Sequence, residues 1–392
     1  MIAKIALPRI VRIGGGAFKE AGQLLQTLGL RTPLIVTDAF FAKQGLADRL
    51  SEILEQSGIG GADVFSGSVP DPTTSSVDAG LEVLKHGTFD AVIGLGGGSA
   101  IDTAKAIAIL GVYGGKMRGY KAPHQQDIPG LPIVAIPTTA GTGSEATRFT
   151  IVTDEETGEK MLCVGLAYLP TAAIVDYELT LSKPMRLTAD TGVDSLTHAI
   201  EAYVSKLANP FADGFALTAM RAIWKNLPTA CFDPQNRPAR EAMMLAATQA
   251  GIAFSNSSVA LVHGMSRPIG AKFHVPHGLS NAMLLPTITA FSIAAAKTRY
   301  ADCARAMAIV LDDVDDDRAA QALVENLREL NQRLEVPTPL QYGIAEPDWF
   351  GSLTTMASQA LASGSPANNP RVPTAEEIEE LYRKVWESSG KS

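Results

Sequence analysis

The sequence predicts an α/β N-terminal domain of the Rossmann-like, parallel-sheet class, followed by an all-α C-terminal domain. Residues 1–183 alternate short apolar runs with amphipathic ones, as a parallel sheet covered by helices requires. Two polar loops rich in glycine or threonine follow apolar runs in this half. From residue 184 onward, helical patterns follow one another with little strand signal. We therefore expect two domains, 1–183 and 184–392.

The first half contains five strand candidates, at residues 10–13, 33–37, 63–65, 90–95 and 131–136. Amphipathic runs follow four of them and predict helices at 18–28, 46–56, 75–85 and 101–110. Because a helix separates consecutive strands, we expect the strands to lie parallel, with ligand-binding groups at their carboxyl ends.

The second half contains six helix candidates, at residues 194–206, 211–226, 239–255, 288–310, 318–334 and 374–387. The last of them begins with Thr374-Ala375-Glu376-Glu377, which is typical of a capping box.

Composition argues against several classes of protein. The 392 residues carry a formal net charge of −8 without a basic stripe, so neither a nucleic acid nor an anionic membrane is an expected partner. The three cysteines, Cys163, Cys231 and Cys303, are widely spaced and are expected to be reduced thiols. We find no signal peptide pattern and no window near the roughly 20 uninterrupted apolar residues of a membrane helix. We expect a soluble, cytoplasmic protein.

Four of the six histidines, His198, His263, His274 and His277, lie close together in the sequence, near Asp194. Asp194 and His198 are four residues apart in a helical pattern, so both can point to one place. A carboxylate with several neutral imidazoles suits a divalent transition metal at roughly 2.0–2.2 Å per ligand. One such histidine alone is more often a structural residue, but the clustering favours a metal site.

Two loops are candidates for nucleotide binding. Residues 94–102 place a glycine run between a strand and a helix, where backbone N–H groups can approach a pyrophosphate. The spacing is not GxGxxG, because Ser99 stands where the third glycine would be, and a simple tight turn would use the same residues. Residues 137–145 form a second polar loop, whose alternative is an ordinary hydroxyl-rich turn. Asp38, if not a simple turn residue, suits an adenosine ribose and favours NAD over NADP.

Four motifs occur in the order seen in the iron-containing (group III) alcohol dehydrogenases, and the chain resembles that family over essentially its whole length. The motifs are Gly96-Gly97-Gly98-Ser99-x-x-Asp102-x-x-Lys105, Pro137-Thr138-Thr139-Ala140-Gly141-Thr142, Asp194-x-x-x-His198 and His263-x13-His277. The ending Asn369-Pro370-Arg371 also resembles the family.

The resemblance implies a dinucleotide-binding domain over 1–183, a helical metal-binding and substrate domain over 184–392, and an active site in the cleft between them. The implied metal is Fe2+, with Zn2+ accepted by the same ligand types, and the implied ligands are Asp194, His198, His263 and His277. The NAD contacts would include Asp38, Asp71, Gly97, Gly98, Ser99, Asp102, Thr138, Thr139, Thr142, Ser144, Ile151, Lys160 and Leu179. The implied reaction passes a hydride between a small primary alcohol or diol and the nicotinamide.

One position departs from the family pattern. Many members carry a second histidine four residues after the ligand that matches His263, where it is thought to help move protons; here that residue is Arg267. Since an arginine stays protonated, it cannot act as a general base. Proton release could instead run through water or His274, or Arg267 could bind an anionic substrate group or pair with a carboxylate for structural reasons. The candidate catalytic residues are therefore His277, His274 and Arg267.

Three other functions stay open at this point. A lyase resembling dehydroquinate synthase would need a dense basic cluster, whereas the candidate segments offer only Arg267 and Lys272. A transhydrogenase or a reductase acting on an anionic substrate could use the same scaffold. A noncatalytic metal- and nucleotide-binding protein is the third possibility. We expect a small alcohol or aldehyde substrate and a homodimer or higher homo-oligomer.

Overall fold

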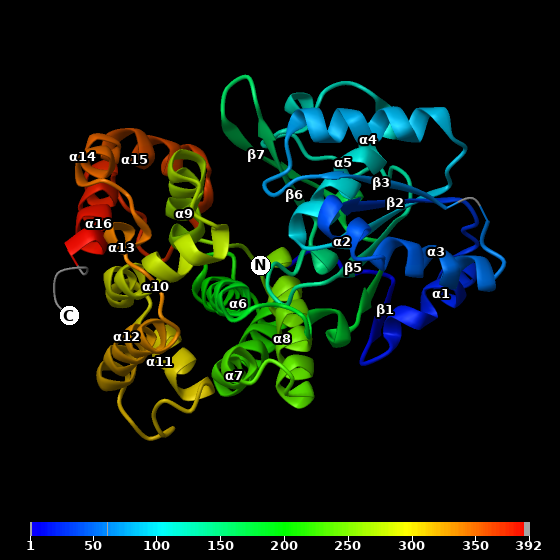
Figure 1. Ribbon diagram of the computed structural model, residues 1–392. Helices are drawn as coiled ribbons and strands as arrows, with labels where there is room; N and C mark the ends of the chain where they lie inside the picture. Colours follow the sequence, from blue (N-terminus) through cyan, green and yellow to red (C-terminus); the bar gives the residue numbers. More distant parts are fainter. Residues whose placement is uncertain (1, 61, 388–392) are drawn as a thin grey trace. The chain divides into compact units, whose positions relative to one another are not determined.

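The computed structural model describes residues 2–60 and 62–387. The chain forms two compact units, Lys4–Ser182 and the chain from Lys183 onward, which run from blue to green and from green to red in Figure 1.

The unit Lys4–Ser182 is built on a six-stranded parallel sheet. The order of the strands across the sheet is β1 (Ile10–Ile13), β8 (Ala172–Val175), β5 (Ile133–Pro137), β4 (Ala91–Gly96), β2 (Pro33–Asp38) and β3 (Asp63–Ser68). β2 and β4 are neighbours although β3 lies between them in the sequence, so the strand order reverses there. In open parallel sheets, ligands bind outside the carboxyl ends of the strands at such a reversal.

Helices cover both faces of this sheet. α1 (Ala21–Leu28) and α3 (Leu46–Gln56) pack on one face, and α4 (Thr74–His86) and α5 (Gly98–Tyr113) on the other (Figure 1). Successive side chains of a strand point to opposite faces. Leu34 and Val36 therefore join the core under α4 and α5, while Ile35 joins the core under α1 and α3. Burial on both faces explains why these strands are continuously apolar, as the sequence indicated.

Three strands of this unit were not predicted. β6 (Phe149–Asp154) and β7 (Glu159–Val164) form an antiparallel hairpin, and β8 completes the parallel sheet. The hairpin turn uses Gly158 at φ 68°, in the left-handed region that favours glycine. The shorter elements of the unit are η1 (Ala17–Glu20), α2 (Ala39–Lys43), η2 (Met117–Tyr120), η3 (Ser144–Ala146), η4 (Leu166–Tyr168) and η5 (Tyr177–Thr180).

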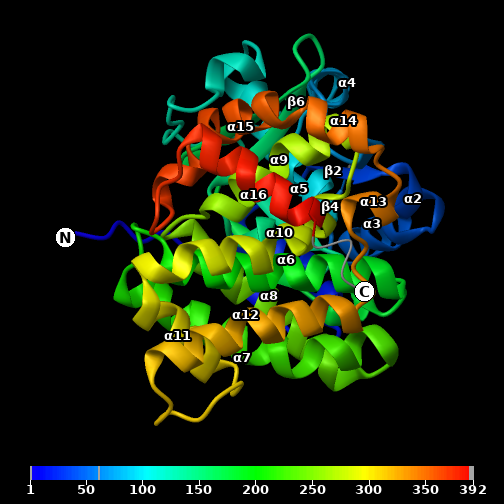
Figure 2. The same cartoon turned by 90° about the vertical axis from the view of Figure 1, so that its left-hand side faces the viewer.

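The second unit is helical throughout its described residues. Its longer helices are α6 (Met185–Val204), α7 (Pro210–Phe232), α8 (Arg237–Ser255), α9 (Leu261–Phe273), α10 (His277–Ser292), α11 (Lys297–Ala306), α12 (Asp316–Arg333), α15 (Leu353–Ala362) and α16 (Ala375–Glu387). The short ones are η6 (Ile293–Ala295), α13 (Pro339–Tyr342), α14 (Glu346–Gly351) and η7 (Ser365–Asn368). α6 packs against α7, α8 and α10, and α10 packs against α9 and α12, as Figure 2 shows from the side of this unit.

The helical half confirms the predicted class but differs from the prediction in several details, among them α15, which was not predicted. The single helix expected at 288–310 is wrong: α10 ends at Ser292 and α11 begins at Lys297. The break falls at Ala296, whose φ of −148° and ψ of 44° are not helical, and no glycine or proline marks it in the sequence. α9 was not predicted, because Pro268 within it discourages a helix. The capping box before α16 is confirmed, with Glu377 N–H donating to Thr374 Oγ1 at 3.2 Å and Thr374 N–H donating to Glu377 Oε2 at 3.0 Å.

One helical stretch among the described residues, His277–Ala295, is long and apolar enough to cross a membrane, which the sequence analysis did not anticipate. Of its apolar window, 61% is buried inside the protein. The same helix packs against α6, α9 and α12, which is the arrangement of a core helix.

Candidate metal centre

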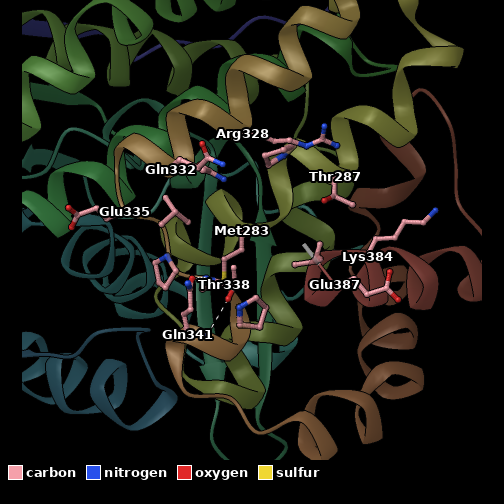
Figure 3. Close-up of a pocket in the computed structure, with 15 residues that line it drawn as sticks. Met283, Thr287, Arg328, Gln332, Glu335, Thr338, Gln341, Lys384 and Glu387 are labelled. Atoms are coloured by element: carbon pink, nitrogen blue, oxygen red, sulfur yellow. Dashed lines mark hydrogen bonds between the residues drawn. The ribbon is translucent and has the colours of Figure 1, made fainter. Parts of the chain in front are cut away.

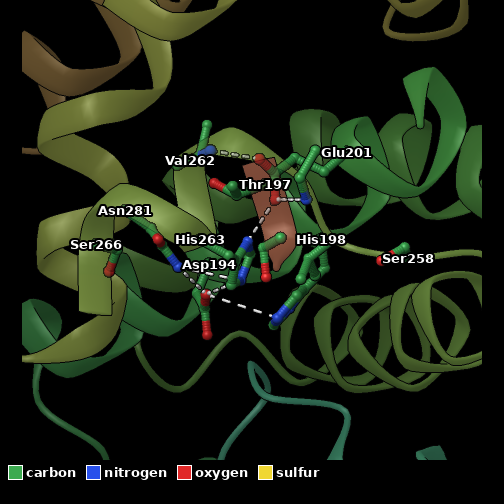
Figure 4. Close-up of polar contacts among 12 residues, drawn as sticks. Asp194, Thr197, His198, Glu201, Ser258, Val262, His263, Ser266 and Asn281 are labelled. Carbon is green, nitrogen blue, oxygen red and sulfur yellow. Dashed lines mark hydrogen bonds and ion pairs between the residues drawn. The ribbon is translucent and has the colours of Figure 1, made fainter. Parts of the chain in front are cut away.

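The four expected metal ligands come from three helices of the second unit. Asp194 and His198 lie one turn apart on α6, His263 lies in the first turn of α9, and His277 begins α10. Figure 4 shows His198 and His263 beside the Asp194 carboxylate. The Nε2 atoms of His263, His277 and His198 lie 3.5, 3.8 and 3.9 Å from Asp194 Oδ1.

The separations among Asp194, His263 and His277 fit a shared cation, whereas His198 lies near Asp194 but outside the group of ligand atoms that are all close to one another. Ligands bonded at about 2.1 Å to one tetrahedral metal lie about 3.4 Å from each other. The ligand atoms of Asp194, His263 and His277 are all within 4.8 Å of one another. Asp194, His198 and His263 are at most 5% exposed, whereas the His277 side chain is 34% exposed. The donor set therefore suits a divalent metal that is buried on one side and accessible on the side of His277.

Electrostatic coupling among these groups is strong. Burial raises the pKa of Asp194, but the neighbouring imidazoles, His198 first, outweigh burial and hold it well below its usual range. Burial lowers the pKa of His198 to about 3, so its ring is neutral near pH 7 and suited to metal ligation. For His263, burial is outweighed by Glu201 and Asp194, which raise its pKa to about 9. A metal that binds Nε2 of His263 must therefore displace a proton.

Glu201 contacts His263 at Nδ1, the ring nitrogen other than the one near Asp194. The sequence did not indicate this residue. Its carboxylate is buried and accepts hydrogen bonds from the N–H groups of Ala260 at 2.8 Å and Val262 at 2.6 Å. Glu201 Oε2 also lies 2.6 Å from Nδ1 of His263 (Figure 4). A carboxylate at Nδ1 fixes the ring so that Nε2 faces the ligand cluster. The available signal was a glutamate seven residues after Asp194, on the same buried face of α6.

Asn281 also belongs to the cluster and was also missed. It lies one turn after His277 on α10 and is fully buried. Its Nδ2 lies 2.7 Å from Asp194 Oδ1, 3.2 Å from His263 Nε2 and 3.3 Å from His277 Nε2. Ligand atoms of three different helices thus lie around one amide nitrogen.

The remaining predicted catalytic residues lie along α9. His274 is exposed, follows the end of α9 with φ 55°, and has a backbone carbonyl that accepts from the Tyr342 hydroxyl at 3.2 Å. Along α9, it is about 16 Å from His263, given a rise of about 1.5 Å per residue. Arg267 is one turn from His263 and is half-buried. Of the two, Arg267 is the one that α9 places beside a ligand.

The first unit brings many of the predicted NAD contacts together at the carboxyl ends of β4 and β5. A Cβ on Gly98 would lie 2.8 Å from the Thr142 side chain, and one on Gly97 would lie 3.7 Å from Thr139, so the two polar loops touch. No side chain caps the N-terminus of α5, which begins at Gly98 and continues with Ser99. Its N–H groups therefore suit a phosphate.

Thr138 adds an observation that favours a ligand at these loops. Its hydroxyl is buried at the end of β5 and has no hydrogen-bond partner among the described residues. Buried hydroxyls without partners are costly, so a ligand that bonds Thr138 would remove that cost. The residues present fit a dinucleotide.

Asp102 and Lys105 support these loops from inside α5. Both Asp102 oxygens are occupied, one by the Ser144 hydroxyl at 2.6 Å and one by the Ile151 N–H at 3.0 Å. The Lys105 ammonium donates to Thr147 O, Thr147 Oγ1 and Phe149 O at 2.7–3.1 Å. Two of the predicted NAD contacts, Ser144 and Ile151, thus donate hydrogen bonds to a third, Asp102, which acts on any ligand through the loop that it holds.

Four further predicted NAD contacts, Asp38, Asp71, Lys160 and Leu179, lie elsewhere in the unit. Asp38 ends β2, and its Oδ1 caps α2 by accepting from Phe41 N–H at 2.9 Å. Asp71, at φ 52°, pairs with Lys160 at 2.8 Å. Leu179 lies in η5, against the core under α1 and α3. Asp38 thus stands at the reversal of strand order between β2 and β4.

A separate pocket of about 1020 Å³ lies in the helical unit, between α10, α12 and α16 (Figure 3). Met283 and Pro286 contribute to it from α10, on a face roughly opposite that of His277. Its wall mixes Arg328 and Lys384 with glutamates, so it shows no net charge preference. None of the predicted site residues lines it.

Comparison with known proteins agrees with this geometry. Residues 8–177 match the family model described as iron-containing alcohol dehydrogenase, and residues 188–386 match the model for the C-terminal part of that family. The NAD-dependent methanol dehydrogenase of Bacillus methanolicus is 37% identical over 97% of this chain and 98% of that protein. The 1,3-propanediol dehydrogenase of Citrobacter freundii is 36% identical over 97% of this chain and 98% of that protein. A solved structure of 1,3-propanediol oxidoreductase superimposes with a TM-score of 0.94 at 34% identity, over 98% of this chain and all of that chain.

Proposed function

The chain belongs to the iron-containing alcohol dehydrogenase family, and from this premise we propose that it is an NAD- and metal-dependent dehydrogenase of small primary alcohols or diols. The observation that carries the proposal is the convergence of three imidazoles on one carboxylate oxygen of Asp194. NAD is supported by the name of the methanol dehydrogenase relative and by the loops around Gly98 and Thr138.

In this proposal Asp194, His198, His263 and His277 hold Fe2+, or Zn2+, for which the same nitrogen and oxygen donors are suitable. A bound metal would supply Lewis acidity that favours loss of the hydroxyl proton, and bound NAD would supply the hydride acceptor. The net reaction converts an alcohol and NAD+ into an aldehyde, NADH and a proton, so the two electrons of the C–H bond leave with the hydride.

The remaining residues of the cluster position the ligands. Glu201 holds His263 so that Nε2 faces the cluster, and Asn281 donates to Asp194. His277 is held by the Ser266 hydroxyl, 3.2 Å from its Nδ1. These contacts fix the ring orientations before a metal binds, which reduces the cost of assembling the site.

We assign dinucleotide binding to residues 1–183 and metal and substrate binding to residues 184–392. The N-terminus of α5 would receive the pyrophosphate, and Asp38 the adenosine ribose, where a carboxylate disfavours the 2′-phosphate of NADP. Cytoplasmic location is supported by three buried, free cysteines. Assembly into a homo-oligomer is supported by β1, which is an edge strand of the sheet and has one side for pairing.

The proposal is tested by following NADH at 340 nm with NAD and a panel of small primary alcohols and diols. Metal-stripped protein would be compared with protein reloaded with Fe(II) without oxygen and with Zn(II). We expect activity only after reloading. If protein that binds both metal and NAD oxidises no alcohol and reduces no aldehyde, the dehydrogenase assignment is wrong and a lyase on this scaffold becomes the better interpretation.

A further inference from the structure

Arg267 is a cation without a protein partner. None of the residues that the structure describes accepts a hydrogen bond from its guanidinium or forms an ion pair with it, and its Nε is buried with no partner. A buried or half-buried charge is normally paired, because removing it from water is costly. The structural alternative, in which Arg267 pairs with a nearby carboxylate, therefore finds no support in the described residues.

The carboxylate that acts on Arg267 electrostatically is Glu201, and it is already occupied. Burial lowers the pKa of Arg267 to about 10 despite Glu201, so the guanidinium is still charged near pH 7. Both Glu201 oxygens accept hydrogen bonds, from Ala260 and Val262 N–H, and Oε2 also contacts His263. The N–H groups of Arg267 are left for a ligand.

The position of Arg267 links it to the proposed metal site. His263 and Ser266 face the cluster, since His263 Nε2 lies 3.5 Å from Asp194 and Ser266 Oγ lies 3.2 Å from His277 Nδ1. Arg267 follows His263 by one turn, so it projects within about 40° of His263 and begins about 6 Å further along α9. A molecule bound at the cluster would have one end near this guanidinium.

The charges around the proposed metal site also favour an anionic ligand. Two buried carboxylates, Asp194 and Glu201, serve this site, and a divalent cation would balance them. The charge of Arg267 then has no counter-charge. A buried site with one excess positive charge favours an anion over a neutral molecule.

We propose that Arg267 binds a carboxylate on the substrate, so that the preferred substrates are short ω-hydroxy acids and the matching ω-oxo acids. The planar guanidinium can hold a carboxylate through two parallel hydrogen bonds. This inference rests on the proposed dehydrogenase function and names its substrate class.

The first test measures binding without turnover. Calorimetric titration of metal-loaded protein, with no NAD present, would compare 4-hydroxybutanoate with 1,4-butanediol, which has a neutral hydroxymethyl group in place of the carboxylate. We expect the hydroxy acid to bind more tightly than the diol. In Arg267→Gln the ratio of the two affinities should fall by about 10- to 100-fold, because the charge-assisted hydrogen bonds are lost. Arg267→Lys should retain part of the preference, because it keeps the positive charge but cannot donate two parallel hydrogen bonds to a carboxylate.

The second test measures turnover with NAD for the same pair. The ratio of kcat/KM for 4-hydroxybutanoate to that for 1,4-butanediol should fall by a similar factor in Arg267→Gln. Lys272→Gln is the matched control, since it removes an exposed cation from the same helix and should change the ratio by less than about twofold. Melting temperatures of all variants separate misfolding from a change in preference.

Two results would overturn the inference. One is an unchanged preference in Arg267→Gln in both tests. The other is a fall in NAD affinity with an unchanged substrate ratio, which would mean that the guanidinium serves the cofactor. A protein that binds 4-hydroxybutanoate through Arg267 but oxidises neither compound would support the anion site while contradicting the dehydrogenase function.

Discussion

Gly278 is the position where a single methyl group should disrupt the metal site. It follows His277 in the first turn of α10 and faces α6. A Cβ built on Gly278 lies 2.4 Å from the Asp190 carbonyl oxygen, 2.8 Å from the Asp190 carbonyl carbon and 3.3 Å from Asp194 Cβ. Gly278→Ala therefore places a methyl group against backbone that cannot rotate away.

The size of the effect follows from these distances. Non-bonded heavy atoms rest at about 3.5 Å, so α10 and α6 must separate by about 1 Å. Overpacking of this kind costs about 1–3 kcal/mol of unfolding free energy. Metal–ligand distances tolerate only about 0.2 Å, so moving His277 by about 1 Å from Asp194 should lower metal affinity by at least about 10-fold.

The assay is the amount of iron or zinc retained per chain at a series of chelator concentrations, with the melting temperature measured in parallel. Gly214→Ala in α7 is the matched control, because a Cβ there meets nothing within 4 Å. It should bind metal normally and be stabilised by about 0.5–1 kcal/mol. If Gly278→Ala retained metal as tightly as the unmodified protein, the close packing of α10 on α6 would not set the ligand geometry.

Three further predictions concern other parts of the chain. Glu201→Gln should lower metal affinity by about 10- to 100-fold in chelator competition, because His263 loses its anionic partner; unchanged affinity would contradict this. Metal present at about 100 times its Kd should stabilise the protein by about 2.7 kcal/mol in thermal unfolding, and Asp194→Asn should abolish that gain. Burial lowers the pKa of Lys105 to about 8, against an ordinary value of 10.5. Between pH 8 and 10.5 the folded state therefore binds fewer protons than the unfolded state, so the free energy of unfolding should rise with pH over this range. Lys105→Met should lack that rise in urea unfolding at pH 7.5 and 9.5, and an identical pH dependence would refute the assignment.

Much of the fold could be predicted because burial leaves a pattern in the sequence. β2, β4 and β5 are apolar on both faces, so they appear as continuous runs, and α3 has the bounds expected from its periodicity. β6 is followed directly by β7, and β8 is followed first by the short η5, so no regular strand–helix alternation marked these three strands. α9 was missed because Pro268 argues locally against a helix, and tertiary packing overrides that preference.

The candidate site, like the fold, could be predicted only in part. Asp194 and His198 could be paired from their spacing of four residues, since both lie on one helix. Glu201 and Asn281 could not be assigned, because their roles depend on helices that meet only in three dimensions. Arg267 is another residue whose role the sequence could not assign. The sequence did not identify a partner for its guanidinium, and no described residue provides one.

In the proposed site, one divalent metal is held by a carboxylate and three imidazoles. X-ray absorption at the iron edge of protein reloaded with Fe(II) tests it most directly. We expect one iron per chain, with nitrogen and oxygen neighbours at about 2.0–2.2 Å and outer-shell scattering from three imidazole rings, reduced to two rings in His263→Ala. A spectrum with one imidazole or none, or one that His263→Ala leaves unchanged, would contradict the assignment of the site.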